Sequence, residues 1–115
     1  LNSGKAVAKG LKEAGFNVKT SIAPLDQVPR ALAARDTRGL IKLVADADTD
    51  CLLGAQILAP EGADSIQTIV LALRHNMTAT ELGEMIFPYL TTVEGLKLAA
   101  QGFGKDVTKL SCCAG

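Results

Sequence analysis

The stretch GLIKLVADADTDCLLGAQIL, residues 39–58, decides the fold of this chain. Two strand-like apolar runs, residues 39–44 and 51–58, flank the polar segment ADADTD, which is Asp-rich as turns often are. Because so short a connection leaves no room for a crossover, the two strands must run antiparallel. This hairpin is the predicted centre of a β-sheet.

The segment before the hairpin predicts one helix and one more strand. Residues 3–14 carry apolar side chains at helical spacing, and residues 16–22 contain the alternating apolar positions of a short strand. An irregular connection bounded by Pro24 and Pro29 is expected next, because proline lacks the backbone donor that regular pairing needs.

The segment after the hairpin predicts three helices. From Asp64 the apolar residues follow a helical period: Ile66, Ile69, Val70, Leu73 and Met77. Thr78 with Glu81 is a capping box that begins a short helix ending at Pro88. The apolar side of that short helix is expected to consist of Leu82, Met85 and Ile86. A second capping box, Thr91 with Glu94, begins the last helix.

Strands and helices therefore fall into separate blocks along the chain. Such segregation is typical of the α+β class, and we expect an antiparallel sheet with helices packed on it. The length of 115 residues fits one domain.

Composition excludes several classes of function. Twelve basic and twelve acidic residues give a net charge of zero, which argues against a nucleic-acid or anionic-membrane partner. No apolar stretch approaches the roughly 20 residues of a membrane span. The sequence also contains no glycine-rich nucleotide loop and no metalloprotease or nucleophile-elbow motif. The one histidine, His75, falls at a predicted helix end, where a solvated or capping role is expected.

The three cysteines are odd in number, so they cannot all form disulfides within one chain, and they favour a reducing compartment, the cytoplasm. Cys51 begins a strand and is expected to be a small buried or half-buried hydrophobe. The adjacent Cys112 and Cys113 leave four hypotheses open from the residues alone: soft-metal binding, redox exchange, lipidation, or no role.

Several segments together resemble the C-terminal part of the mercuric reductase family. They are VPRAL (28–32), DTRGLIKLV (36–44), LLGAQILAPEGADSIQTIVLALR (52–74), FPYLTTVEGLKLAAQ (87–101) and LSCCAG (110–115). The resemblance is strong over residues 28–115 and weak over residues 1–27. It implies the dimerisation-domain fold of the pyridine nucleotide-disulfide oxidoreductases over residues 1–109, followed by a flexible Cys-Cys tail at residues 110–115.

The resemblance also implies a function for that tail. In the family, the intact enzyme reduces Hg(II) to Hg(0) with NADPH and FAD, both bound by other domains of the parent enzyme. The C-terminal cysteine pair of one subunit takes up Hg(II) and passes it to the active site of its partner in a homodimer. Cys112 and Cys113 inherit this metal-binding role by position, and the chain alone is not expected to be active. The alternative hypothesis is an interaction-only dimerisation module without a metal role.

One departure from related disulfide reductases concerns a His-Pro-Thr-x-x-Glu motif, whose histidine acts on active-site thiols. The corresponding stretch here is FPYLTTVE, residues 87–94, so Phe87 or Tyr89 replaces the histidine, depending on the alignment. The resemblance implies that Tyr89 lines the Hg(II) site. Glu94 is interpreted mainly as a capping residue.

Overall fold

The hairpin predicted from the sequence is the centre of a three-stranded antiparallel sheet. The structure, a computed structural model, describes residues 3–105. The strands are β1 (Val18–Pro24), β2 (Leu40–Asp46) and β3 (Leu52–Leu58), in the spatial order β1-β2-β3. Both neighbouring pairs are antiparallel, which confirms the prediction for β2 and β3.

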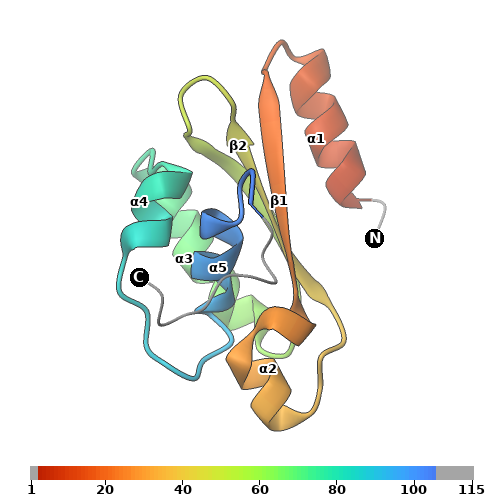
Figure 1. Cartoon of the computed structure of the whole chain (residues 1–115). Helices are drawn as coiled ribbons and strands as arrows, with labels where there is room; N and C mark the ends of the chain where they lie inside the picture. The colour runs from red at the N-terminus through yellow and green to blue at the C-terminus, as the bar shows by residue number, and fades with distance from the viewer. Residues whose placement is uncertain (1–2, 106–115) are drawn as a thin grey trace.

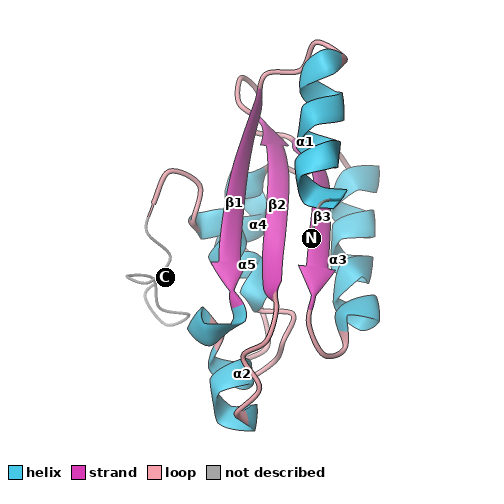
Figure 2. Ribbon diagram, turned by 90° about the vertical axis from the view of Figure 1, so that its right-hand side faces the viewer, coloured by secondary structure: helices cyan, strands magenta, loops and turns pink. Residues whose placement is uncertain are grey.

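Helices cover both faces of this sheet (Figures 1 and 2). α1 (Ser3–Glu13) lies against one face. The opposite face carries α3 (Gly62–Arg74), α4 (Ala79–Glu84) and α5 (Gly95–Gln101). A 3-10 turn (Leu25–Gln27) and α2 (Pro29–Ala34) lie at one end of the sheet. The α+β class is therefore confirmed. No helix within residues 3–105 is long and apolar enough to span a membrane.

The core lies between the sheet and the α3–α4–α5 layer. Its largest fully buried side chains are Leu25, Val28, Ile41, Leu43, Ile69, Leu82 and Leu96. On β1, the buried positions are Ser21 and Ala23, whereas Ile22 is exposed. Since side chains alternate along a strand, β1 gives the core its smaller residues.

The helix α2 was not predicted, because Pro29 was interpreted only as the boundary of an irregular connection. Proline fits the first position of a helix, where the missing N–H has no intrahelical partner in any case. Pro29 occupies such a position, and the helix ends at Ala34, followed by the capping residue Arg35, whose φ of 55° is left-handed. Pro29 therefore begins α2 and does not simply bound an irregular connection.

The prediction that Met85 and Ile86 form the apolar side of a helix ending at Pro88 is wrong. α4 ends at Glu84, and Met85 is already extended, with ψ of 153°. Ile86 is 95% exposed. The capping box that begins α4 is confirmed, since the Thr78 hydroxyl accepts a hydrogen bond from the Glu81 N–H at 3.1 Å.

The last helix begins later than its predicted cap. The Thr91 hydroxyl accepts from the Glu94 N–H at 3.3 Å, but residues 92–94 form a turn and α5 starts at Gly95. Gly95 allows the helix to approach the sheet closely, because an added Cβ would lie 2.5 Å from the Ile41 Cδ1.

Candidate functional site

The structure shows some of the predicted site residues and not others. Cys112 and Cys113 lie outside the described residues, as does the predicted tail of residues 110–115. Tyr89 and Glu94 lie on the connection between α4 and α5. Tyr89 is exposed and Glu94 is buried, so the two side chains occupy different environments.

The connection between α4 and α5 is held by Thr91. Its hydroxyl donates to the Pro88 carbonyl at 2.8 Å and accepts from the Glu94 N–H at 3.3 Å. Leu90 has a φ of 56°, a left-handed conformation that costs a non-glycine residue roughly 1–2 kcal/mol. This turn presents the Tyr89 side chain to solvent, with 67% of its surface exposed.

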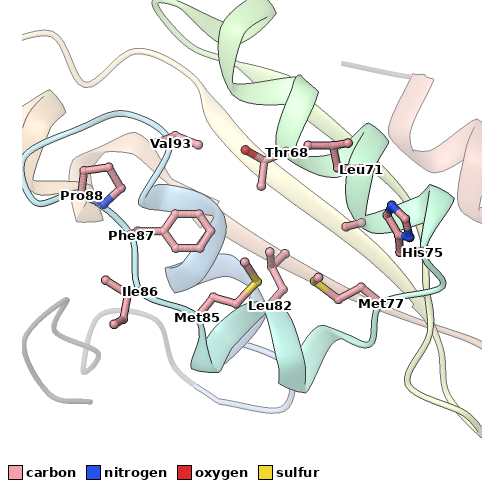
Figure 3. A pocket seen from close by; sticks show the side chains of 11 residues that line it. Thr68, Leu71, His75, Met77, Leu82, Met85, Ile86, Phe87, Pro88 and Val93 are labelled. Atoms are coloured by element: carbon pink, nitrogen blue, oxygen red, sulfur yellow. The ribbon is translucent and has the colours of Figure 1, made fainter.

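A groove opens beside this connection, between α3 and α4. It has a volume of about 490 Å³. Figure 3 shows its lining side chains, which come from α3, α4, the connection between these two helices and the segment that follows α4. They are Thr68, Leu71, Ala72, His75, Met77, Leu82, Met85, Ile86, Phe87, Pro88 and Val93. Thr68 and His75 are the only polar side chains in this lining, so the groove is suited to an apolar partner surface.

Glu94 carries a carboxyl group that is almost fully buried. The residue is 3% exposed, and its Oε1 has no hydrogen-bond partner among the described residues. Burial raises the pKa of Glu94, while the Thr91 N–H and the Lys97 charge act in the opposite direction. The interpretation of Glu94 as a capping residue explains the contact with Thr91 but not this burial.

Cys51 is a half-buried residue next to β3, as expected from the sequence. It pairs with Thr78 in an isolated bridge, and its Sγ lies 3.9 Å from the Asn76 carbonyl oxygen. His75 is the exposed C-cap of α3 and not part of a cluster of ligands. Within residues 3–105, no three His, Cys, Asp or Glu side chains are grouped to hold a metal ion.

Sequence reasoning missed one polar cluster, formed by Lys19, Asp50 and Thr80. Lys19 and Asp50 form an ion pair, and Asp50 Oδ2 accepts from the Thr80 N–H and hydroxyl at 2.9 and 2.6 Å. Burial alone would raise the pKa of Asp50, but the hydrogen bonds from Lys19 and Thr80 outweigh it and lower the pKa. Residues about 30 positions apart along the chain form this cluster, so no local pattern could indicate it.

The fold and the sequence both match one known family. Residues 6–100 match the pyridine nucleotide-disulphide oxidoreductase, dimerisation domain. The chain belongs to this family of dimerisation domains. In the solved flavoprotein disulfide reductase RclA from Escherichia coli, the corresponding region aligns with a TM-score of 0.76 and 25% identity. That alignment covers 81% of this chain and 21% of RclA. LpdA from Mycobacterium tuberculosis shows the same fold, with a TM-score of 0.75 over 82% of this chain and 20% of LpdA, at 21% identity.

Within the dimerisation-domain family, the chain is similar to mercuric reductases. It is 57% identical over 101 residues to the mercuric reductase of Serratia marcescens, covering 88% of this chain and 22% of that enzyme. With the Bacillus cereus enzyme the identity is 55% over 104 residues, covering 90% of this chain and 16% of that enzyme. The resemblance inferred from the sequence is confirmed, and the chain spans about a fifth of the length of these curated relatives.

Proposed function

We propose that this chain is the C-terminal homodimerisation and Hg(II)-delivery module of a mercuric reductase. In the intact enzyme, Hg(II) is the substrate and is reduced to Hg(0) with NADPH and FAD. The identity of more than 50% with mercuric reductases, over most of this chain, carries the proposal. The LSCCAG ending supplies the thiols that delivery requires.

The two nucleotide cofactors belong to the rest of the parent enzyme in this proposal. The groove of the described part offers only Thr68 and His75 as polar side chains and no array of backbone donors from a glycine-rich loop. It does not fit the pyrophosphate of FAD or NADPH, which needs such donors. The proposed contribution of this chain is therefore assembly and metal transfer.

Assembly is supported by the apolar residues that the fold leaves uncovered. Leu71, Met85 and Ile86 are exposed and line the same groove, and Val70 is exposed on the same helix as Leu71. Contiguous exposed apolar side chains of this kind mark interaction surfaces in soluble proteins. The proposed occupant is the same face of a second chain, related by a two-fold axis.

Metal delivery is assigned to Cys112 and Cys113. Hg(II) is a soft ion, which thiolates bind well, and two sulfur ligands satisfy it. Thiolate exchange then moves the ion from one cysteine pair to another without releasing it. Cys51 is a poor candidate, because its half-buried Sγ lies against the Asn76 carbonyl.

Tyr89 is the proposed contribution of the α4–α5 connection to the Hg(II) site of the partner subunit. Its exposed side chain on the turn held by Thr91 is free to contact a second chain. A phenol there would line the site without acting as a base toward thiols.

A mercury titration tests the metal role. Wild type is expected to bind one Hg(II) per chain through Cys112 and Cys113, with proton release and tighter binding at higher pH, since thiolate is the ligand. The double variant Cys112→Ser/Cys113→Ser should lose this binding, and Cys51→Ser should keep it. Retention of binding in the double variant would favour the interaction-only module. Half the stoichiometry would instead indicate one site shared between two tails.

A further inference from the structure

The connection between α4 and α5 is anchored on both sides of Tyr89. Phe87 and Val93 are partly buried against the core, and both line the groove (Figure 3). Glu94, directly after Val93, is almost fully buried. Between these anchors the chain turns outward, and Tyr89 is 67% exposed. The position of the phenol therefore depends on the conformation of the few residues between Phe87 and Val93.

The turn that carries Tyr89 has a backbone conformation that its own residues disfavour. Leu90 has a φ of 56°, in the left-handed region, where the Cβ of an L-residue lies too close to the following carbonyl oxygen. Glycine and asparagine enter this region readily, but leucine does not. A conformation of this kind persists only where surrounding contacts enforce it. The turn therefore needs a contact from outside the pair of residues 89 and 90.

Thr91 supplies that contact through its hydroxyl group. The hydroxyl donates to the Pro88 carbonyl at 2.8 Å and accepts from the Glu94 N–H at 3.3 Å. One hydroxyl thus links the residue before Tyr89 to the buried N-cap of α5. Because Pro88 and Thr91 flank Tyr89 and Leu90, the bond between them closes the turn and fixes the direction in which the Tyr89 side chain leaves the backbone.

We propose that Thr91 is a positioning residue for Tyr89. Its hydroxyl keeps Leu90 left-handed and so directs the phenol away from the core and toward a second chain. A side chain that is already held in place loses little conformational freedom when its partner arrives, and a preorganised site gains from this. The inference rests on the role proposed above for Tyr89 at the Hg(II) site of the partner subunit.

The backbone order of the turn tests the proposal. Nuclear magnetic resonance relaxation gives an order parameter for each amide, which is about 0.85 in rigid backbone and below about 0.6 in mobile backbone. Wild type should show rigid values at Tyr89 and Leu90. Thr91→Val removes the hydroxyl from a side chain of similar size and should lower both values into the mobile range. Mobile values in wild type, or rigid values in Thr91→Val, would overturn the proposal.

Two further variants separate the hydroxyl from general packing. Thr91→Ser keeps the hydroxyl and should retain the wild-type order of Tyr89 and Leu90. Thr92→Val makes the same change one position along, where the side chain forms no hydrogen bond within residues 3–105, and should leave the order unchanged. The amide of buried Leu98 in α5 reports on the fold and should stay rigid in every variant. A loss of order that Thr92→Val reproduces, or that spreads to Leu98, would contradict a specific role for Thr91.

The phenol itself can be followed directly. Tyr89 is the only tyrosine and the sequence contains no tryptophan, so tyrosine fluorescence reports on this side chain alone. Its fluorescence anisotropy should fall in Thr91→Val, because the released turn adds motion to the ring, and should be retained in Thr91→Ser and Thr92→Val. An unchanged anisotropy in Thr91→Val would mean that the phenol is oriented without Thr91, against the proposal.

A double-mutant cycle in the intact reductase distinguishes this inference from the function on which it rests. If Tyr89 serves the Hg(II) site, Tyr89→Phe lowers kcat/KM for Hg(II), and Thr91→Val lowers it through the same phenol. The double variant should then match Tyr89→Phe within about twofold, because residues that act through one another are not additive. Losses that multiply would show that Thr91 acts independently, which the inference excludes. If Tyr89→Phe keeps the full kcat/KM, the role of Tyr89 fails, and the order parameters still decide whether Thr91 holds the turn.

Discussion

Glu94 places an ionisable carboxyl where water barely reaches it. The side chain follows the turn held by Thr91, and the close approach of Gly95 to the sheet draws the start of α5 inward. Burial disfavours the charged form, which is why the pKa of Glu94 is raised. At this scale the sequence showed only a capping residue, whereas the structure shows a carboxyl whose charge opposes folding.

The pH dependence of stability should reveal this carboxyl. The folded-state pKa of Glu94 is raised, so the folded state favours the neutral carboxyl. The stability that this preference contributes is fully present below the unfolded-state pKa of about 4.3 and is lost as pH rises through the folded-state pKa. Glu94→Gln should therefore gain free energy of unfolding relative to wild type as pH increases over that window. Chemical denaturation of both proteins from pH 4 to 8 measures the difference. A constant difference across the range would contradict the expectation.

The packing of α5 on the sheet illustrates what decides structure at the scale of elements. Gly95 begins the helix and faces Ile41 of β2 and Val28, both of which are fully buried. An added Cβ would lie 2.5 Å from the Ile41 Cδ1 and 3.1 Å from the Val28 Cγ2. The absence of a side chain at Gly95 thus sets the distance between the helix and the sheet.

Gly95→Ala should destabilise the fold by about 1–3 kcal/mol, the usual range for overpacking a filled core. Alanine has a higher helix propensity than glycine, but the gain of at most about 1 kcal/mol is smaller than the steric cost. Gly10→Ala is the matched control, since nothing lies within 4 Å of its added Cβ and it stands inside α1. That substitution should be stabilising or neutral. Thermal unfolding measures the change in melting temperature of each variant. If α5 approaches the sheet closely, the melting temperature falls for Gly95→Ala and does not fall for Gly10→Ala.

At the scale of the whole molecule, the fold buries residues of α2, α3, α4 and α5 and leaves an apolar surface over α3 and the segment after α4. Val70 and Leu71 follow buried Ile69 directly, so the apolar character of α3 extends around more of the helix than the core can cover. Met85 and Ile86 extend this surface because α4 stops before them. A surface of this kind explains how a small domain can serve assembly.

Charges placed on this surface should dissociate the proposed homodimer. In the double variant Leu71→Lys/Ile86→Lys, two like charges per chain would be buried against their symmetry mates, and the dimer should weaken at least roughly tenfold, equivalent to about 1.4 kcal/mol. Leu32→Lys is the control, because Leu32 is equally exposed but lies on α2, away from the groove. Sedimentation over a range of concentrations measures the dimer affinity of the double variant and of the control. Equal dimer affinities for the variant and the control would place the interface elsewhere.

The sequence by itself determined the elements whose signals are local. The two strand-like apolar runs on either side of ADADTD defined β2 and β3, and the helical period after Asp64 defined α3. The segments from VPRAL to LSCCAG also indicated the family, because identity over many positions needs no coordinates. Local backbone preferences and side-chain periodicity depend on residues that are close together in the sequence, so both can be inferred from the sequence alone.

Only the tertiary structure decided the features that depend on which distant residues meet. The burial of Glu94, the exposure of Ile86 and the contact of Lys19 with Asp50 and Phe103 all follow from how the helical layer is placed on the sheet. A one-residue register shift between Val44 and Ala45 likewise comes from the pairing of two strands. Such contacts join segments tens of residues apart, and packing selects them only once the whole core has formed, since interiors are close-packed and admit few alternative arrangements.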